Sequence, residues 1–149
     1  MEISENGLKL LSEWEGEILH IYKDSAGLPT VGVGHLLTKE ERVGGKYEGG
    51  ITHEQAMQIL TNDLRRFERT VNDGVKVALN QNQYDALVIF AFNIGDGGFL
   101  SSTALRKINA KEFDRVPDAM QMWNKAGGKI DDGLINRRKK EIKLFLEPV

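Results

Sequence analysis

The chain has 149 residues, of which 40% are hydrophobic and 28% are charged, and its formal net charge is −2. This length suits one domain that can bury a core without disulfides, and the composition excludes a disordered chain. The absence of cysteine excludes a disulfide framework, a thiolate zinc site and a cysteine nucleophile. Three scattered histidines argue against a histidine-rich metal centre, and the near-neutral charge gives no bias toward nucleic acid.

The first residues carry neither the positive start nor the apolar run of a signal peptide. No segment approaches the roughly 20 apolar residues that span a bilayer. We therefore expect a protein that resides in the cytoplasm without stable membrane insertion. Anything that it does outside the cytoplasm requires a separate exit route.

Apolar periodicity predicts an amphipathic helix around residues 8–14, which Gly16 ends as a left-handed cap. Between residues 20 and 35 the period changes to alternation, with turn signals at residues 25–29, so we expect a β-hairpin there. Residues 44–50 are predicted to form a surface loop. Thr52 and Gln55 form a capping box that opens a long helix through about Val71.

The second half of the sequence is predicted to be helical. Asn80 and Gln83 begin a helix that is apolar almost all round and ends at Gly95, which is typical of a buried central helix. Ser101 or Ser102 caps a short helix, residues 111–125 form another, and residues 132–146 form the last. The pattern is mostly helix with one small sheet near the start, an α+β arrangement with most of the core after residue 75.

The predicted hairpin brings a carboxylate and a hydroxyl together. A five-residue turn around Gly27 would place Asp24 opposite Thr30 with about 5 Å between their Cβ atoms, beside a bare glycine floor. Such a pair can orient a water molecule. Glu15, at the end of a largely apolar helix, is where a carboxyl group could be shielded and stay protonated as a general acid.

Two carboxyl groups are the usual equipment for cleaving a glycosidic bond. The structural alternative is that Asp24 only serves the turn and Glu15 is a surface acid, because a chain with 22 acidic residues contains many such spacings. Spacing alone leaves both interpretations open.

Further motifs run in order along nearly the whole chain. Glu15, Asp24 and Thr30 are followed by Val-Gly-Val-Gly-His at 31–35, Asn-Gln-Asn-Gln-Tyr-Asp-Ala-Leu at 80–87, Phe-Asn-Ile-Gly at 92–95, Leu-Arg at 105–106, Trp123 and Arg-Arg at 137–138. This series resembles the phage-type (T4-like) lysozyme or endolysin family of glycoside hydrolases, and looks most similar to its P22-like branch.

The resemblance implies an enzyme that cleaves the β-1,4 bond between N-acetylmuramic acid and N-acetylglucosamine in peptidoglycan. By position, Glu15 matches the general acid, Asp24 the carboxylate that assists water or stabilises the sugar cation, and Thr30 the hydroxyl that helps to place the water. Other sugar-contacting positions differ at Pro117 and residues 101–104.

The resemblance also assigns binding and supporting residues. Leu36 and Phe92 match positions that line the family's substrate cleft. Arg137 matches an arginine near the acid, and His35 matches a structural histidine whose ion-pair partner is Asp63. Neither a metal nor a cofactor is expected.

The expected fold is the lysozyme-like two-lobed one, with residues 1–149 as a single catalytic domain. It has a small β-containing lobe at about 13–60, a helical lobe at about 75–149 with helix 1–12 packed on it, and a long connecting helix. We expect a monomer whose partner is the peptidoglycan glycan strand, held in the host cytoplasm and released to the wall at lysis by a separate holin.

Two rival functions remain open from the sequence. One is a lytic transglycosylase, which cleaves the same bond without water, although an Asp–Thr pair suited to holding water disfavours it. The other is a non-catalytic wall binder or membrane-active protein that uses the basic residues 137–143, although a solvated helix face explains most of these. An inverting or a retaining outcome is equally open.

Overall fold

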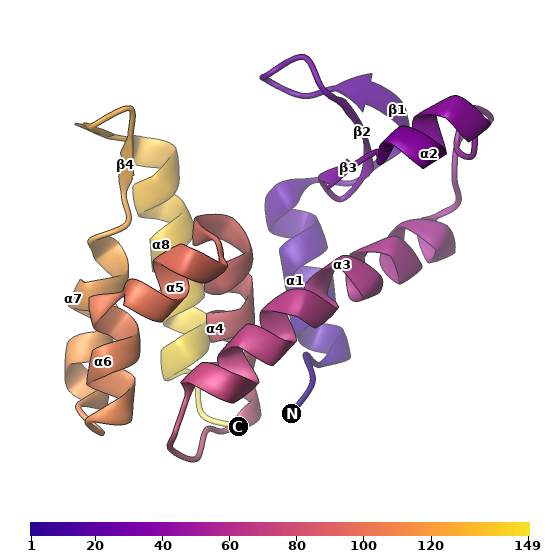
Figure 1. Cartoon of the computed structure of the whole chain (residues 1–149). Coiled ribbons are helices and arrows are strands. Elements are labelled where there is room, and N and C mark those ends of the chain that lie inside the picture. Colours follow the sequence, from indigo (N-terminus) through magenta and orange to yellow (C-terminus); the bar gives the residue numbers. More distant parts are fainter. The chain divides into compact units, whose positions relative to one another are not determined.

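The computed structural model describes all 149 residues, which form the predicted α+β fold dominated by helices (Figure 1). Its contacts define two compact units, which we call the N-terminal unit (Leu8–Arg65) and the C-terminal unit (Met1–Gly7 with Arg66–Val149). Two helices, α1 (Glu5–Glu15) and α3 (His53–Gly74), contribute residues to both units.

The N-terminal unit contains a three-stranded antiparallel sheet of β1 (Ile18–Lys23), β2 (Pro29–Gly32) and β3 (His35–Leu36), in that order. Its small core consists of Val31, Leu37, Tyr47, Ile51 and Ala56. Gly16 ends α1 as predicted, with a φ of 84° and an N–H that donates to the Ser12 carbonyl at 2.9 Å. This cap turns the chain directly from α1 into β1.

The predicted register of the hairpin is wrong. Tyr22, not Asp24, lies opposite Thr30, and the last pair of the ladder is Lys23 with Pro29. One further backbone hydrogen bond, between Asp24 and Leu28, leaves residues 25–27 as the loop. The Asp24 N–H donates to the Leu28 carbonyl and the Gly27 N–H to the Asp24 carbonyl, both at 2.9 Å. Gly27 has a φ of 79°, and a left-handed glycine at the third loop position favours this shorter loop. Asp24 and Thr30 therefore remain on one face, but as diagonal neighbours.

The segment after β3 is more ordered than predicted. Helix α2 (Lys39–Gly44) begins at a capping box in which Thr38 and Glu41 exchange hydrogen bonds. The predicted surface loop at 44–50 contains Tyr47, whose side chain is buried in the small core. A Thr-x-x-Glu signal was present in the sequence, but six residues are too few to show helical periodicity.

The C-terminal unit is built around α4 (Gln81–Ile94), in which residues 84–91 are all buried, as predicted. The capping box at Thr52 forms as predicted, the predicted helix start at Asn80 also has the form of a capping box, and Gly95 ends α4 as predicted. Helix α8 (Asp132–Leu146) packs on α4 with the predicted bounds. Between them lie α5 (Asp96–Ser101) and α6 (Thr103–Asn109), which Ser102 caps.

Residues 111–125 do not form the single helix that was predicted. They contain the 3₁₀ turn η1 (Phe113–Arg115) and α7 (Val116–Gln121), with Pro117 in the first turn of α7. A hairpin of β4 (Lys125–Ala126) and β5 (Lys129–Ile130) follows. Gly127 and Gly128 have φ values of 58° and 80°, so two consecutive glycines permit a tight turn where only a helix break was expected.

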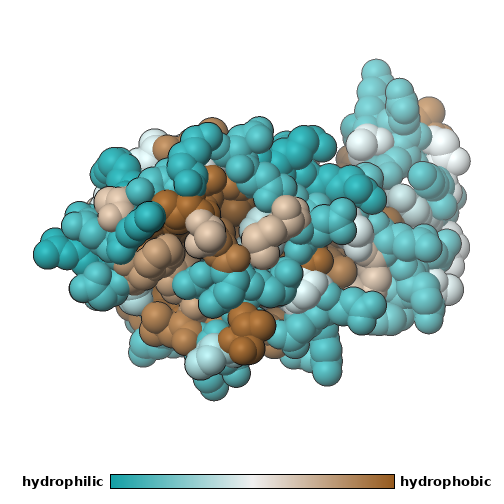
Figure 2. All heavy atoms as spheres, turned by 90° about the horizontal axis from the view of Figure 1, so that it is seen from below, coloured by the Kyte–Doolittle hydropathy of each residue, from teal (hydrophilic) through white to brown (hydrophobic).

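Apolar side chains gather in one region of the face seen from below, while hydrophilic residues cover much of the rest (Figure 2). None of the helices combines the length and the apolar composition that crossing a bilayer requires.

Candidate active site

The three proposed catalytic residues, Glu15, Asp24 and Thr30, all belong to the N-terminal unit. Glu15 is the last residue of α1, and Gly16 redirects the chain immediately after it. Its side chain is exposed, which differs from the shielding that the sequence suggested.

Asp24 closes the turn between β1 and β2. Its Oδ1 atom accepts hydrogen bonds from the backbone N–H groups of Ala26 and Leu28, each at 2.9 Å. These bonds fix the orientation of a part-buried carboxylate, and no residue donates to Oδ2. The structural and catalytic interpretations of Asp24 are thus compatible, because each uses a different oxygen.

Thr30 is buried in β2, with only 2% of its surface exposed. Its hydroxyl donates to the Leu28 carbonyl at 2.9 Å, which leaves the oxygen lone pairs as acceptors. Leu28 therefore holds both side chains. Its N–H donates to the Asp24 carboxylate, and its carbonyl accepts from the Thr30 hydroxyl. This single residue sets the relative positions of the carboxylate and the hydroxyl.

The glycine floor expected beside this pair is only partly open. A Cβ atom added at Gly32 would lie 3.6 Å from Ile51 and 3.7 Å from Ala56, so side chains of the same unit cover that position. At Gly34 a Cβ atom would meet nothing within 4 Å. Free space next to the backbone is therefore confined to Gly34.

His35 joins three elements of the N-terminal unit. Its Nδ1 lies 2.8 Å from Asp63 on α3, and its Nε2 lies 3.0 Å from Glu41 on α2. The hydrogen bond to Asp63 raises the pKa of His35 to about 9, burial opposes this, and Glu41 adds to the rise. The ring is therefore an imidazolium at neutral pH that donates to both carboxylates.

Glu41 is the supporting residue that the sequence analysis missed. Its burial alone would raise the pKa of its carboxyl, but hydrogen bonds from the Thr38 N–H and from His35 lower the pKa overall. The capping motif at Thr38 was the available signal, because it fixes Glu41 in the first turn of a helix that follows β3 directly.

The two predicted sugar-contacting residues lie in different units. Leu36 is half exposed on β3 of the N-terminal unit, opposite Thr30 on β2. Phe92 is part-buried on α4 of the C-terminal unit, and its ring packs edge-on against Phe67 with 5.4 Å between the centroids. Both offer apolar surface.

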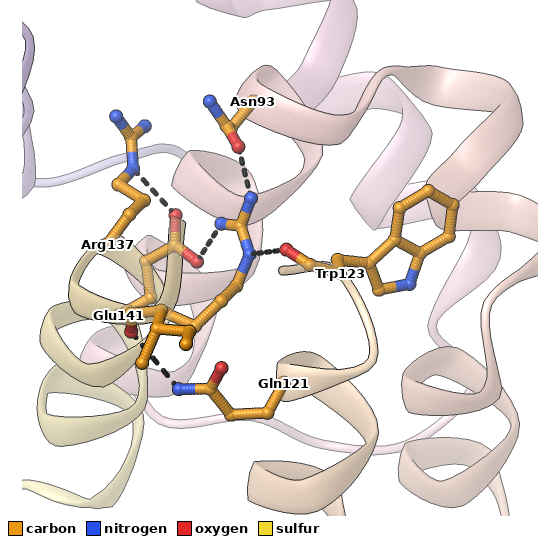
Figure 3. A network of polar contacts seen from close by, with 7 residues as sticks. Asn93, Gln121, Trp123, Arg137 and Glu141 are labelled. Carbon is orange, nitrogen blue, oxygen red and sulfur yellow. Dashed lines mark hydrogen bonds and ion pairs between the residues drawn. The ribbon is translucent and has the colours of Figure 1, made fainter. Parts of the chain in front are cut away.

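Arg137 belongs to a polar network within the C-terminal unit (Figure 3). Its Nε donates to Glu141 at 2.9 Å, and Arg138 donates to the other carboxylate oxygen. Arg138 also donates to the Trp123 carbonyl at 2.9 Å and to the Asn93 side chain, whereas the Trp123 ring points away from the network.

Glu141 is fully buried, and this burial raises the pKa of its carboxyl while the two guanidinium groups oppose the rise. Arg138 is only 1% exposed, so it does not belong to the solvated basic face that the sequence suggested. Lys139, Lys140 and Lys143 are exposed and do form such a face. No group of three or more potential metal ligands occurs anywhere in the chain.

Comparisons with known proteins agree with this fold. Residues 12–141 match the model of the phage lysozyme family. The endolysin of Salmonella phage P22 is 44% identical over 153 residues, covering 98% of this chain and 99% of the relative.

Two solved structures extend the agreement to three dimensions. A crystal structure of a P22 lysozyme mutant has a TM-score of 0.86 at 42% identity, and covers 99% of both chains. The muramidase domain of SpmX from Asticaccaulis excentricus has a TM-score of 0.85 at 34% identity, also with 99% coverage of both chains.

These matches define the class as lysozyme, a glycoside hydrolase that acts on peptidoglycan. Within that class, the chain belongs to the phage lysozyme family. The predicted family and the predicted enzyme class are thereby confirmed.

Proposed function

We propose that Glu15 protonates the leaving oxygen of the β-1,4 bond between N-acetylmuramic acid and N-acetylglucosamine, while Asp24 and Thr30 handle the attacking water. The observation that supports this proposal is that the backbone of Leu28 holds both Asp24 and Thr30 by hydrogen bonds of 2.9 Å. Prepositioned groups lower the cost of ordering water in the transition state. Cleavage of this bond degrades the wall and lyses the host cell.

Each group has one defined task in this mechanism. Asp24 Oδ1 is engaged by the turn, so Oδ2 accepts the proton of the water or stabilises positive charge on the sugar. Thr30 accepts a hydrogen bond from the same water through its free lone pair. Inversion requires carboxyl groups about 6.5–9.5 Å apart and retention about 5–5.5 Å, and the anomer of the first product distinguishes them.

Leu36 and Phe92 are proposed as apolar contacts for the sugar rings. Arg137 is proposed to support the general acid, and His35 with Asp63 to keep β3 fixed on α3, which they join by a 2.8 Å contact. Substituting these residues should alter KM or stability more than the identity of the products.

We also infer that residues 1–149 act as one catalytic domain and as a monomer. Before lysis the protein would reside in the host cytoplasm without inserting into the membrane, and a separate holin would release it. Sedimentation of the purified chain tests whether it is a monomer. The timing of lysis with and without a coexpressed holin tests whether a holin releases it.

Mass spectrometry of a digest tests hydrolysis against the transglycosylase alternative. Purified peptidoglycan should yield muropeptides with reducing N-acetylmuramic acid ends. A 1,6-anhydro end would overturn the role of water, and hence of Asp24 and Thr30.

Asp24→Asn separates the two roles of this residue, since the amide oxygen can still accept from Ala26 and Leu28. We expect an unchanged unfolding midpoint and a loss of activity of about 10²-fold or more. Asp24→Ala removes both roles and should lower both the unfolding midpoint and the activity. An active Asp24→Asn variant would leave Asp24 with a structural role only.

A further inference from the structure

The N-terminal unit contains a groove of about 310 Å³ that the proposed chemistry does not use. Helix α3 forms one wall with Gln55, Gln58, Ile59 and Asn62, and the opposite rim is formed by residues 46–47. His35 and Asp63 complete it. All of the lining residues belong to a single compact unit.

The groove opens on the face of the sheet away from Thr30. Strand β2 pairs with β3 so that Thr30 lies opposite Leu36 and Val31 lies opposite His35. Because successive side chains of a strand point to opposite faces, His35 and the groove lie behind the face that carries Thr30 and Leu36. A ligand in the groove would therefore not compete with a sugar bound beside Thr30.

The wall on α3 offers unused hydrogen-bonding groups. Gln55, Gln58 and Asn62 recur at three- and four-residue steps, which aligns them along one helix face over about 10 Å. Gln58 and Asn62 are exposed and make no hydrogen bond to another residue, and Gln55 uses only its carbonyl oxygen, in the α3 capping box. Ile59 provides an apolar strip between these amides.

The charges around the groove cancel. Lys46 and the His35 imidazolium are positive, and Asp63 and Glu41 are negative. Both ring N–H groups of His35 are already used by the two carboxylates. A neutral groove lined by amides favours an uncharged ligand rich in hydroxyl and amide groups over a strongly anionic polymer.

We propose that this groove is a second glycan-binding site, which takes the N-acetylated sugars of a peptidoglycan strand other than the one being cleaved. The inference rests on the proposed function, because it identifies the ligand as the enzyme's own polymer. Side-chain amides would pair with hydroxyl and acetamido groups, while Ile59 contacts a ring face. Holding a second strand raises the effective concentration of the enzyme at an insoluble wall.

The Gln58→Ala/Asn62→Ala variant tests this site on two substrates. On intact walls its clearing rate should fall by about 3- to 10-fold, whereas hydrolysis of a soluble glycan oligosaccharide should stay within about twofold of wild type. The matched control, Asn6→Ala/Asn136→Ala, removes two other exposed helical amides and should change neither rate. Wild-type clearing of walls by the first variant, or an equal loss on both substrates, would overturn the proposal.

A binding measurement tests the site independently of catalysis. N-acetylglucosamine oligomers should shift the side-chain amide NMR signals of Gln58 and Asn62 in wild type, and should leave those of Asn6 and Asn136 in place. Shifts produced by a free stem peptide and not by the sugar, or no shifts at all, would refute a glycan site. A wild-type protein that binds through these amides but hydrolyses nothing would instead contradict the proposed function.

Discussion

The ion pairs of His35 with Asp63 and Glu41 lead to a quantitative prediction of how the free energy of unfolding depends on pH. The pKa of His35 rises from 6.5 to about 9 in the folded state, mainly through the hydrogen bond to Asp63. A rise in pKa of about 2.5 corresponds to about 3 kcal/mol of stability, as an upper limit. Because the folded pKa lies above the unfolded one, this contribution is fully present below pH 6.5 and is lost as the pH rises through about 9.

His35→Asn removes the charge and should lower the free energy of unfolding by about 1 to 3 kcal/mol at pH 5.5, because solvent around the part-buried ring screens the ion pairs. At pH 10 the wild-type ring is neutral, so the difference between the two proteins should shrink to about 1 kcal/mol or less. Urea unfolding followed by tryptophan fluorescence measures both values, and Trp14 reports from the same unit.

The matched control is His53→Asn. His53 is 61% exposed and contacts Glu17 at 2.7 Å, so its loss should cost less than about 1 kcal/mol at either pH. If His35→Asn destabilised the protein equally at pH 5.5 and pH 10, the ion pairs would not be the source of the stability, and the reasoning would be refuted.

Three further substitutions test the structural account by urea unfolding. Glu141→Gln removes the buried carboxylate that pairs with the buried Arg138 and should lower the free energy of unfolding by about 3 kcal/mol, whereas the exposed Glu147→Gln should be neutral. Gly27→Ala forces a side chain into a φ of 79° and should cost about 1 kcal/mol. An unchanged free energy of unfolding for Glu141→Gln or for Gly27→Ala would contradict the structure. Thr38→Ala removes the α2 cap and should cost about 1 kcal/mol, and a loss confined to Glu41→Ala would argue against capping.

The elements that could be predicted from sequence are those whose signals are local. Thr52 and Asn80 each begin a helix through a capping box, and both helices begin there. Helix α8 has the predicted bounds because Asp131 caps it directly before an amphipathic run. Local hydrogen bonds and periodicity decide such features, so a single sequence contains them.

The features that were predicted wrongly depend on contacts that no local sequence pattern encodes. The hairpin register depends on the left-handed conformation of Gly27 and on the hydrogen bond from Leu28 to Asp24. The same sequence is also compatible with the five-residue loop that was predicted. The burial of Arg138 depends on Glu141, three residues away, and on Asn93, which is distant in sequence. The roles of Glu15, Asp24 and Thr30 came from the resemblance to phage lysozymes and not from their spacing.

The activity of Glu15→Gln on purified peptidoglycan tests the central proposal most directly. The amide cannot donate the acid proton, so release of reducing ends should fall by about 10²- to 10⁴-fold, with an unchanged unfolding midpoint. Glu13→Gln, at an exposed glutamate two residues earlier on α1, should retain wild-type activity. If Glu15→Gln released reducing ends at the wild-type rate, general acid catalysis by Glu15 would be wrong.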